Sequence, residues 1–575
     1  MVRPGSRAAA AGTVFLALLG ALLAVDHQRR DSATMDEPFH ALAGCEYALS
    51  GTYWANLEHP PLMKLLAGAS AGLSGARPPL LPEPFSFRTA EAPQPFLYRN
   101  AIPPETLLAA ARRPFPLLFA GLVLVAAFAA WRAAGPLAAA GVALLLAFEP
   151  TLVAHAAFLH TDVAAALGFL STVVAAHAAL RRPSWLLWAG TGLLLGLSLA
   201  AKFTAVFLGP ILLVLVLSWL LVKRRETGRL PLRSLGGLAL AGALGTLVLL
   251  GVYAFSMRRM PASEAERSVR LFLRSRQVSA EAVERVAGVS RVFPPAGHYA
   301  AGLVGVAEQN RRGGGVNVFR GDVSVEGFPS YFPVAFLVKS SLGFLAALLF
   351  ATALVLGRRV RAGFGALVYL LPPVYVFLSS LTSSYNIGVR HVLPAVPFLA
   401  VAAVVVIVRG LPSGAAAAAL LALGLYQAGE TLAVHPHEVS FFNLASGGPS
   451  KGHLWLNDSN LDWGQDLVRL AGELESRGEA DGATVAYFGG GYVPYHLPKA
   501  RLFDAAATPL TPGLYAVSSF LVAAGPELMA FNGDTLRAAG YARLRRVLAE
   551  RGKPEGRVGY SILLYRLPGE RTPPP

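Results

Sequence analysis

The sequence predicts an α-helical polytopic membrane protein that carries a small α/β domain outside the membrane at its C-terminal end. Of its 575 residues, 54% are hydrophobic and only 15% are charged, a composition too apolar for a soluble protein. Apolar runs long enough to cross a bilayer recur up to residue 432, and beyond it Gly, Asp, Asn and Trp become frequent. We therefore predict a membrane domain at residues 1–432 and a second domain at residues 433–575.

Runs of roughly 18 to 22 apolar residues predict about eleven membrane helices. In chain order they are expected near residues 9–25, 114–131, 137–156, 162–180, 185–201, 203–222, 234–256, 333–356, 363–381, 390–408 and 411–432. No small-x-small cleavage site clearly follows the first run, so we interpret it as a retained signal anchor.

Positive charges in the short loops predict the orientation in the membrane. One side collects Arg3, Arg7, Arg132, Arg181, Arg182, Lys223, Arg224, Arg225, Arg358, Arg359, Arg361 and Arg409. By the positive-inside rule this side is cytoplasmic, which places the loops 26–113 and 257–332 and the C-terminal domain outside. Since these loops hold much of the net charge of +16, we expect a lipid bilayer and no nucleic acid as partner. The high Ala, Arg and Gly content suggests a bacterial inner (cytoplasmic) membrane, with the site facing the periplasm or exterior.

In the C-terminal domain, β-type patterns predict strands near residues 484–488, 513–517 and 561–565, and helical patterns near 467–476 and 534–539. The single cysteine, Cys45, excludes an internal disulfide. The external parts must therefore be held by packing and by contacts with the membrane helices.

Two acids in the first external loop, Asp36 and Glu37, are the candidates for a general base. A carboxylate at the outer membrane face can take the proton of a hydroxyl acceptor. Neighbouring residues on an extended segment point to opposite sides, so we expect one of them to act while the other forms a salt bridge or a cap. The alternative is that Asp36 is simply the N-cap of a following helix.

The run Glu58-His59-Pro60-Pro61 precedes an apolar segment, Leu62 to Gly72, that is expected to lie along the membrane interface. Lys64, in the first turn of this segment, could contact a lipid phosphate. The alternative is a lysine that extends toward the interface without a ligand.

Further cations at the outward helix ends could complete a phosphate site, because arginine suits bidentate phosphate contacts. They are Arg112, Arg113 and Arg390, the last followed by His391. The alternative for each is a headgroup anchor.

A second acid, in His160-Thr161-Asp162, returns to the same face as the first loop. Its alternative is an N-cap of the following helix. A divalent metal at the site is conceivable, although no ligand spacing is diagnostic and the metal stays undetermined. Lys202 and Lys339 lie in apolar segments, where lysine is costly, and are expected to pair with acids or phosphate.

The C-terminal domain holds Asp458, Asp462, Trp463 and Gln465 within a short segment. Such a set suits recognition of an acceptor or sugar, with the ring stacking on a sugar face and the polar groups binding hydroxyls. The alternative is an Asp/Asn-rich turn that caps the next helix.

Together these motifs resemble the protein O-mannosyltransferase family and its bacterial relatives, including the aminoarabinose lipid A transferases and other phospholipid-carrier-dependent glycosyltransferases. The resemblance rests on Asp36-Glu37, His59-Pro60-Pro61-Leu62-x-Lys64, His160-Thr161-Asp162, Tyr331-Phe332-Pro333 with Lys339, and Asn386 to Pro394. It spans roughly residues 10 to 470 in organisation, although only the short motifs are specific. It implies the GT-C fold.

The resemblance also implies inverting transfer of a hexosyl or pentosyl group from a polyprenyl-phosphate donor to a hydroxyl acceptor on a protein, lipid or glycan. By family role, Asp36 would be the base and Asp162 the second acid, and the donor phosphate would lie near Lys64, Arg112 or Arg113, and Arg390, with His59 beside it. The aminoarabinose branch carries Glu-Lys-Pro where this chain has Glu58-His59-Pro60, which leaves the phosphate ligand open. No cofactor is implied with certainty, and metal use does not carry over.

A transporter or flippase is the main alternative function. In it, Glu149, Lys202 and Lys339 would bind substrate or couple protons. Such a protein is expected to have symmetric halves and short loops, whereas this chain has long external loops. The layout therefore favours the enzyme over the transporter. A third interpretation is an inactive membrane scaffold whose external domain binds a partner, and such a scaffold would need neither Asp36 nor Asp162.

Overall fold

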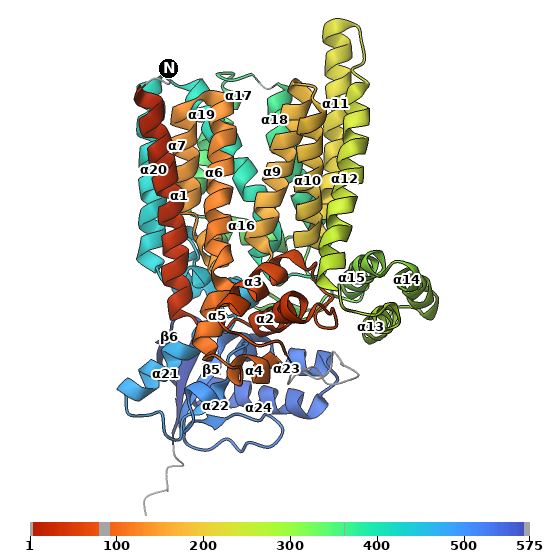
Figure 1. Cartoon of the computed structure of the whole chain (residues 1–575). Helices are drawn as coiled ribbons and strands as arrows, with labels where there is room; N and C mark the ends of the chain where they lie inside the picture. Colours follow the sequence, from red (N-terminus) through yellow and green to blue (C-terminus); the bar gives the residue numbers. More distant parts are fainter. Residues whose placement is uncertain (1–3, 80–92, 362, 569–575) are drawn as a thin grey trace, which may run out of the picture.

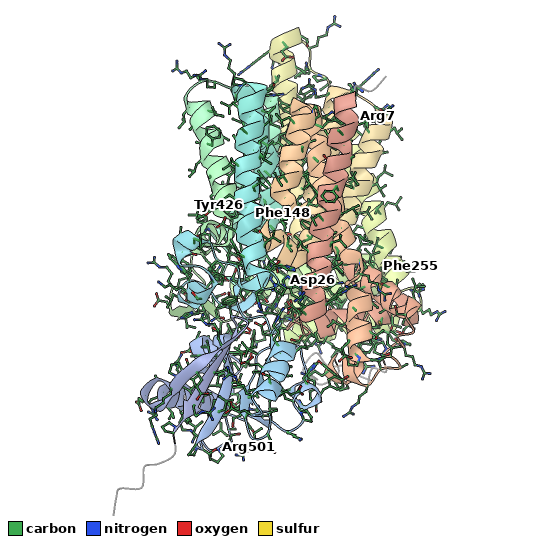
Figure 2. All side chains as sticks on the ribbon, turned by 90° about the vertical axis from the view of Figure 1, so that its left-hand side faces the viewer. Arg7, Asp26, Phe148, Phe255, Tyr426 and Arg501 are labelled. Carbon is green, nitrogen blue, oxygen red and sulfur yellow. The ribbon has the colours of Figure 1, made fainter. Side chains whose placement is uncertain are left out.

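The computed structural model describes residues 4–79, 93–361 and 363–568. Its long helices stand side by side in one bundle, and the C-terminal sheet covers one end of it (Figure 1). A view turned by 90° shows the same two parts, with Arg7 and Asp26 toward opposite ends of the first helix and Arg501 in the sheet region (Figure 2). The predicted fold class, a helical membrane protein with a small α/β region near the C-terminus, is confirmed.

Seven helices of the described residues are long and apolar enough to cross a membrane, or up to nine if each of two bent pairs forms one span. The seven are α1 (Pro4–Arg30), α5 with α6 (Pro104–Arg112 and Pro114–Ala134), α9 (Asp162–Arg181), η2 with α11 (Phe203–Phe207 and Leu208–Thr227), α12 (Arg233–Ser256), η3 with α19 (Val389–Ala395 and Val396–Gly410) and α20 (Ser413–Val434). Two apolar helices, α10 (Trp185–Ala201) and α18 (Phe364–Ser380), are shorter. Every predicted apolar segment therefore has a helical counterpart.

Two of the predicted helices are broken. α7 (Pro136–Ala147) meets α8 (Pro150–Ala156) at 65°, and α16 (Tyr331–Lys339) meets α17 (Leu342–Leu356) at 109°. The first break follows from Pro150, which cannot continue a helix and holds Glu149 in an extended conformation. At the second break Ser341 is extended, and its side chain accepts a hydrogen bond from the Phe344 backbone N–H.

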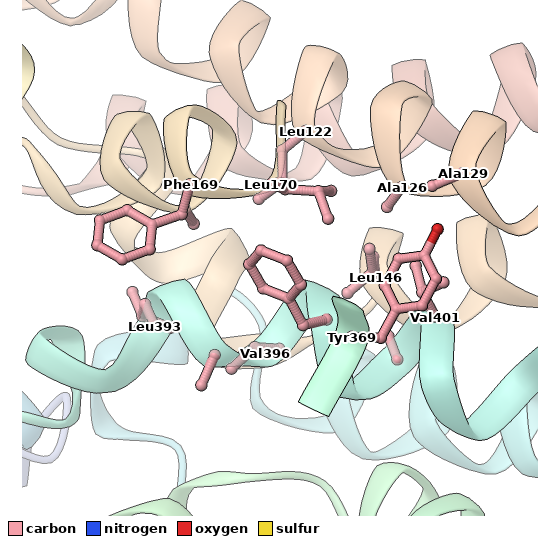
Figure 3. Close-up of a cluster of buried hydrophobic side chains, with 14 of the residues drawn as sticks. Leu122, Ala126, Ala129, Leu146, Phe169, Leu170, Tyr369, Leu393, Val396 and Val401 are labelled. Atoms are coloured by element: carbon pink, nitrogen blue, oxygen red, sulfur yellow. The ribbon is translucent and has the colours of Figure 1, made fainter. Parts of the chain in front are cut away.

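Small and branched side chains fill the bundle core. Figure 3 shows side chains from several elements packed together, and all of them are buried. They are Leu122, Ala126 and Ala129 of α6, Leu146 of α7, Phe169 and Leu170 of α9, Tyr369 of α18, and Leu393, Val396 and Val401 of η3 and α19. In a bilayer such close packing, rather than removal of apolar surface from water, holds helices together. The bundle is therefore a rigid base for the loops at its end.

The described parts of the loops 26–113 and 257–332 lie at the same end as the C-terminal sheet (Figure 1). They form α2 (Glu37–Cys45), η1 (Glu46–Ser50), α3 (Leu62–Leu73), α4 (Pro93–Tyr98), α13 (Ala262–Ser275), α14 (Ala280–Val292), α15 (Pro294–Arg311) and the antiparallel pair β1 (Asn317–Phe319) and β2 (Asp322–Ser324). α2 and α3 touch through backbone, since a Cβ on Gly68 would lie 1.9 Å from the Gly44 carbonyl oxygen.

The C-terminal residues form a mixed sheet of order β4-β3-β5-β7-β6. Its elements are α21 (Leu467–Ser476), β3 (Thr484–Ala486), α22 (Val493–His496), β4 (Arg501–Leu502), β5 (Gly513–Ser518), α23 (Ser519–Phe531), α24 (Thr535–Arg551), β6 (Lys553–Val558) and β7 (Ile562–Leu567). β3 runs parallel to β4 and β5, while β7 is antiparallel to β5 and β6. The three predicted strands are β3, β5 and β7, and the predicted helices are α21 and the start of α24. Between α20 and α21 the chain runs through the short 3-10 turns η4 (Glu438–Ser440), η5 (Leu444–Ser446), η6 (Pro449–Leu454) and η7 (Asp458–Asn460).

Candidate active site

Asp36 pairs with Arg390 although the two lie 354 residues apart in the chain. Asp36 occupies the N-cap position of α2, as the alternative interpretation predicted, but its side chain makes no cap hydrogen bond. Its Oδ2 lies 3.2 Å from Nη1 of Arg390, with 36% of the Asp36 side chain and 9% of the Arg390 side chain exposed. Asp36 is thus a carboxylate that a substrate can reach.

Glu37 has the opposite surroundings. Its side chain is fully buried and accepts two hydrogen bonds from Arg112, from Nε to Oε1 at 2.7 Å and from Nη2 to Oε2 at 2.6 Å. The remaining donors of Arg112 go to the carbonyl oxygens of Gln28, Asp31 and Ser32. This geometry does not favour Glu37 as the base or Arg112 as a phosphate ligand, because both are already paired.

Asp162 is enclosed behind the site. Its Oδ1 lies 2.5 Å from Nζ of Lys202, and its Oδ2 lies 3.8 Å from Nδ1 of His155. Asp162 begins α9, where the N-cap residue is Thr161, so the carboxylate is not an N-cap. Lys202 therefore pairs with an acid, one of the two kinds of partner that the sequence predicted for it. Since only 2% of the Asp162 side chain is exposed, its effect on Asp36 is electrostatic.

Histidine side chains line the same region. His160 lies 3.4 Å from the Thr34 hydroxyl, and its ring centroid lies 5.4 Å from that of His40. His40 in turn is 5.3 Å from His59. His40 was not predicted as a site residue. The sequence indicates it only by its position four residues after Asp36, one turn further along α2.

Burial sets the charges of these groups. Loss of hydration raises the pKa of Asp36, and Arg390 offsets only part of the rise. Burial lowers the pKa of His40 to about 3 and also lowers that of His59 well below its usual value. These histidines are therefore neutral near pH 7, and Arg390 supplies the positive charge that contacts Asp36.

Lys64 is buried rather than placed at a ligand. Its Nζ donates to the carbonyl oxygens of Asn56 at 2.5 Å and His59 at 2.7 Å, and 1% of the residue is exposed. It therefore neither extends to the lipid interface nor reaches an open site. Burial lowers the pKa of Lys64, and its role here is to hold the 56–59 turn.

The other predicted cations and acids lie away from the Asp36 carboxylate or are already bonded. Lys339 donates to the carbonyl oxygens of Val439 and Asn460, both at 2.7 Å. Arg113 is exposed and donates to the Ser74 hydroxyl. Glu58 forms an ion pair with Arg276, and the His391 ring lies 5.9 Å from those of Tyr385 and Phe332.

The predicted sugar-binding segment is largely internal. Asp462 accepts from the Phe520 backbone N–H, and Gln465 bonds to the backbone of Trp463 and Leu461. Only 1% of Trp463 is exposed, so its ring has no free face for a sugar. Asp458 is half-buried, and burial raises its pKa to about 7. The charges of Arg390 and Asp36 also act on this carboxyl group.

Over residues 4–79, 93–361 and 363–568, no group of three or more His, Cys, Asp or Glu side chains is arranged to hold a metal ion. The residues that surround Asp36 therefore do not form a recognisable metal centre.

No protein-family model matches the chain, and no curated protein does. Among solved structures, the oligosaccharyltransferase of Archaeoglobus fulgidus aligns over 92% of this chain and 72% of its own length, with 11% identity and a TM-score of 0.48. The ArnT structure from Cupriavidus metallidurans, bound to undecaprenyl phosphate, aligns over 98% of both chains, with 14% identity and a TM-score of 0.33. The Pmt1-Pmt2 protein O-mannosyltransferase complex of S. cerevisiae gives 17% identity and a TM-score of 0.36 over 45% of this chain, which spans only 35% of that chain's length.

These solved structures are the GT-C glycosyltransferases to which the sequence motifs were related. In each case the TM-score is below 0.5 and the identity is 17% or less.

Proposed function

We propose that the protein is an inverting glycosyltransferase that moves a sugar from a polyprenyl-phosphate donor to a hydroxyl acceptor at the outer face of the cytoplasmic membrane. The observation that carries this proposal is the Asp36–Arg390 pair, in which a reachable carboxylate and a cation meet at the end of the bundle. The first loop, the Arg390 turn and the C-terminal segment all converge there.

The proposed reaction uses Asp36 as the base and Arg390 as the cation. The acceptor oxygen forms a bond to the anomeric carbon while its proton passes to Asp36. The bond from that carbon to the phosphate oxygen breaks, and the electron pair leaves with the lipid phosphate. A single displacement inverts the anomeric centre.

Arg390 is suited to the departing phosphate. Only its Nη1 contacts Asp36, and its buried Nε has no hydrogen-bond partner among the described residues. A guanidinium group can donate two parallel hydrogen bonds to the oxygens of one phosphate. A phosphate would therefore satisfy a donor that the protein leaves unpaired.

The proposal is tested by sugar transfer in membranes that contain the wild type, Asp36→Asn or Asp26→Asn, with a panel of radiolabelled polyprenyl-phosphate sugars. Asp26 is the matched control, because its side chain is 40% exposed and pairs with Arg30 and His435 rather than with Arg390. We expect the wild type and Asp26→Asn to release lipid phosphate and Asp36→Asn not to do so.

Equal turnover by a folded Asp36→Asn would exclude Asp36 as the base. Absence of turnover with every donor and acceptor, together with movement of a labelled lipid across the membrane, would favour the transporter.

A further inference from the structure

Trp463 contacts Arg390 and the residue that precedes Asp36. The Arg390 guanidinium carbon lies 4.5 Å from the centre of its ring. Its carbonyl oxygen accepts a hydrogen bond of 3.0 Å from the backbone N–H of Met35, the residue before Asp36. One residue of the C-terminal segment thus joins two parts of the site that come from opposite ends of the chain.

The ring is itself held in place. The His160 ring stacks on it at 4.2 Å with 27° between the planes, and Phe158 contacts it edge-on at 5.8 Å. Gln465 Oε1 accepts from the Trp463 backbone N–H at 2.9 Å. Ring and backbone are both fixed, so Trp463 can position what it touches.

The turn just before Trp463 binds the loop that carries Arg390. The Ser459 hydroxyl donates to the Ile387 carbonyl oxygen at 2.5 Å, and Asn460 Oδ1 accepts from the Val389 backbone N–H at 2.9 Å. The residue after Trp463 binds the first loop, because the Ser32 hydroxyl donates to the Gly464 carbonyl oxygen at 2.9 Å. The segment 459–464 therefore bridges the two loops.

We infer that Trp463 is a positioning residue that holds Arg390 beside Asp36, so that the C-terminal segment forms the floor of the active site. This inference rests on the proposed function for its catalytic consequence, but its structural content can be tested without turnover. It replaces the predicted stacking of a sugar on Trp463, for which the ring has no open face.

Trp455 offers a matched control eight residues earlier. It is half-buried, its Nε1 donates to the Ser446 carbonyl oxygen, and the Arg320 guanidinium carbon lies 5.8 Å from its ring centre. The Trp455–Arg320 pair thus resembles the Trp463–Arg390 pair but does not contact Asp36.

The first experiment measures the accessibility of both arginines. Purified full-length protein is treated with the arginine-selective reagent phenylglyoxal, and modification of Arg390 and Arg320 is followed by peptide mass spectrometry. We expect Trp463→Leu to raise the modification rate of Arg390 by roughly 3- to 30-fold, as expected when a cation–π contact is lost, and to leave Arg320 unchanged. Trp455→Leu should not change the rate at Arg390. An unchanged rate at Arg390 in Trp463→Leu would overturn the inference.

The second experiment measures turnover against pH with the active donor. A loosened Arg390 opposes the rise of the Asp36 pKa less, so we expect the acidic limb of kcat for Trp463→Leu to move to higher pH, with Trp463→Phe restoring it in part. Loss of packing alone would lower the amount of active protein without moving this limb. If Trp463→Leu makes Arg390 more accessible but leaves kcat and its pH profile as in the wild type, Trp463 does not contribute to catalysis.

The two proposals fail in different ways. A wild type without turnover contradicts the proposed function, while the modification rates still decide whether Trp463 holds Arg390. If Trp463→Leu does not give a single folded species on size-exclusion chromatography, Trp463→Phe is compared with Trp455→Phe, with a smaller change expected at Arg390 in the first of these alone.

Discussion

Adjacent acids of the first loop form two very different ion pairs. Glu37 and Arg112 are sealed from solvent and bonded through two parallel contacts, whereas Asp36 and Arg390 meet through a single contact and the Asp36 side chain is partly exposed. A buried, fully bonded pair has no capacity left for a ligand, and removal of one partner is costly. The comparison shows that Asp36–Arg390, the pair joined by a single contact, is the pair that a substrate can reach.

The largest expected effect comes from removal of the reachable carboxylate. Asp36→Asn keeps the shape of the side chain but cannot accept a proton, so we expect turnover to fall by about 10²- to 10⁴-fold, the usual contribution of a general base. The thermal midpoint should stay close to that of the wild type. Release of labelled lipid phosphate and thermal unfolding in detergent measure the two quantities.

The reverse pattern is expected at the neighbouring acid. Glu37→Gln leaves the Arg112 charge buried without a counter-charge, so we expect a loss of stability of about 3–5 kcal/mol. Glu281→Gln removes the acid of the exposed Glu281–Arg285 pair and should leave the midpoint unchanged. A stable Glu37→Gln enzyme that has lost only turnover would reverse the roles of the two acids.

A smaller effect separates the two arginines. Arg390→Lys keeps the charge but loses the planar fork, and we expect a loss of roughly 1.5–3 kcal/mol in kcat/KM for the donor, the range for one hydrogen bond to a charged group. Arg112→Lys should instead lower the yield of folded protein. Donor kinetics and size-exclusion profiles of the two variants distinguish these outcomes, and similar donor kinetics in both would contradict the comparison.

The smallest effect is the pH dependence of turnover. Asp36 must be deprotonated to act, and its pKa is raised by loss of hydration. Turnover should therefore be lost on acidification at a higher pH than the ordinary aspartate pKa would give, and it should be retained as the pH rises. A kcat profile that is flat down to the ordinary aspartate range would show that Asp36 does not titrate in the rate-limiting step.

Composition and periodicity were enough to predict the apolar helices and three of the five strands in the C-terminal sheet, because these signals depend on neighbouring residues in the sequence. Asp36 and Arg390 were also found from their residue types at outward helix ends. Their contact was not predictable, since it joins positions 354 residues apart. The bends at Glu149 and Ser341 were missed because an apolar run of full length gives the same signal whether it is straight or broken.

The errors in the predicted site have a common cause. Arg112 and Lys64 were expected near phosphate from their places at a helix end and at the membrane interface, and Lys339 was expected to pair with acids or phosphate because lysine is costly in an apolar segment. The structure gives them backbone carbonyls and Glu37 as partners. Which acceptor a cation meets depends on loops distant in sequence. Trp463 was interpreted as a sugar platform for the same reason, since its burial by His160 and Arg390 is a tertiary property.

The two sides of the bridge between the first loop and the segment 459–464 are synthesised at different times. Ser32 and its partner Gly464 are separated by 432 residues, which at ribosomal speed corresponds to a delay of roughly 20 to 90 s. During that interval Asp36 has left the ribosome while the residues that fix its neighbour Met35 have not been made. The inserted chain therefore lacks this contact until the segment 459–464 has been made, and truncation after residue 434 but before residue 459 removes the segment while leaving the helices α1 to α20 intact.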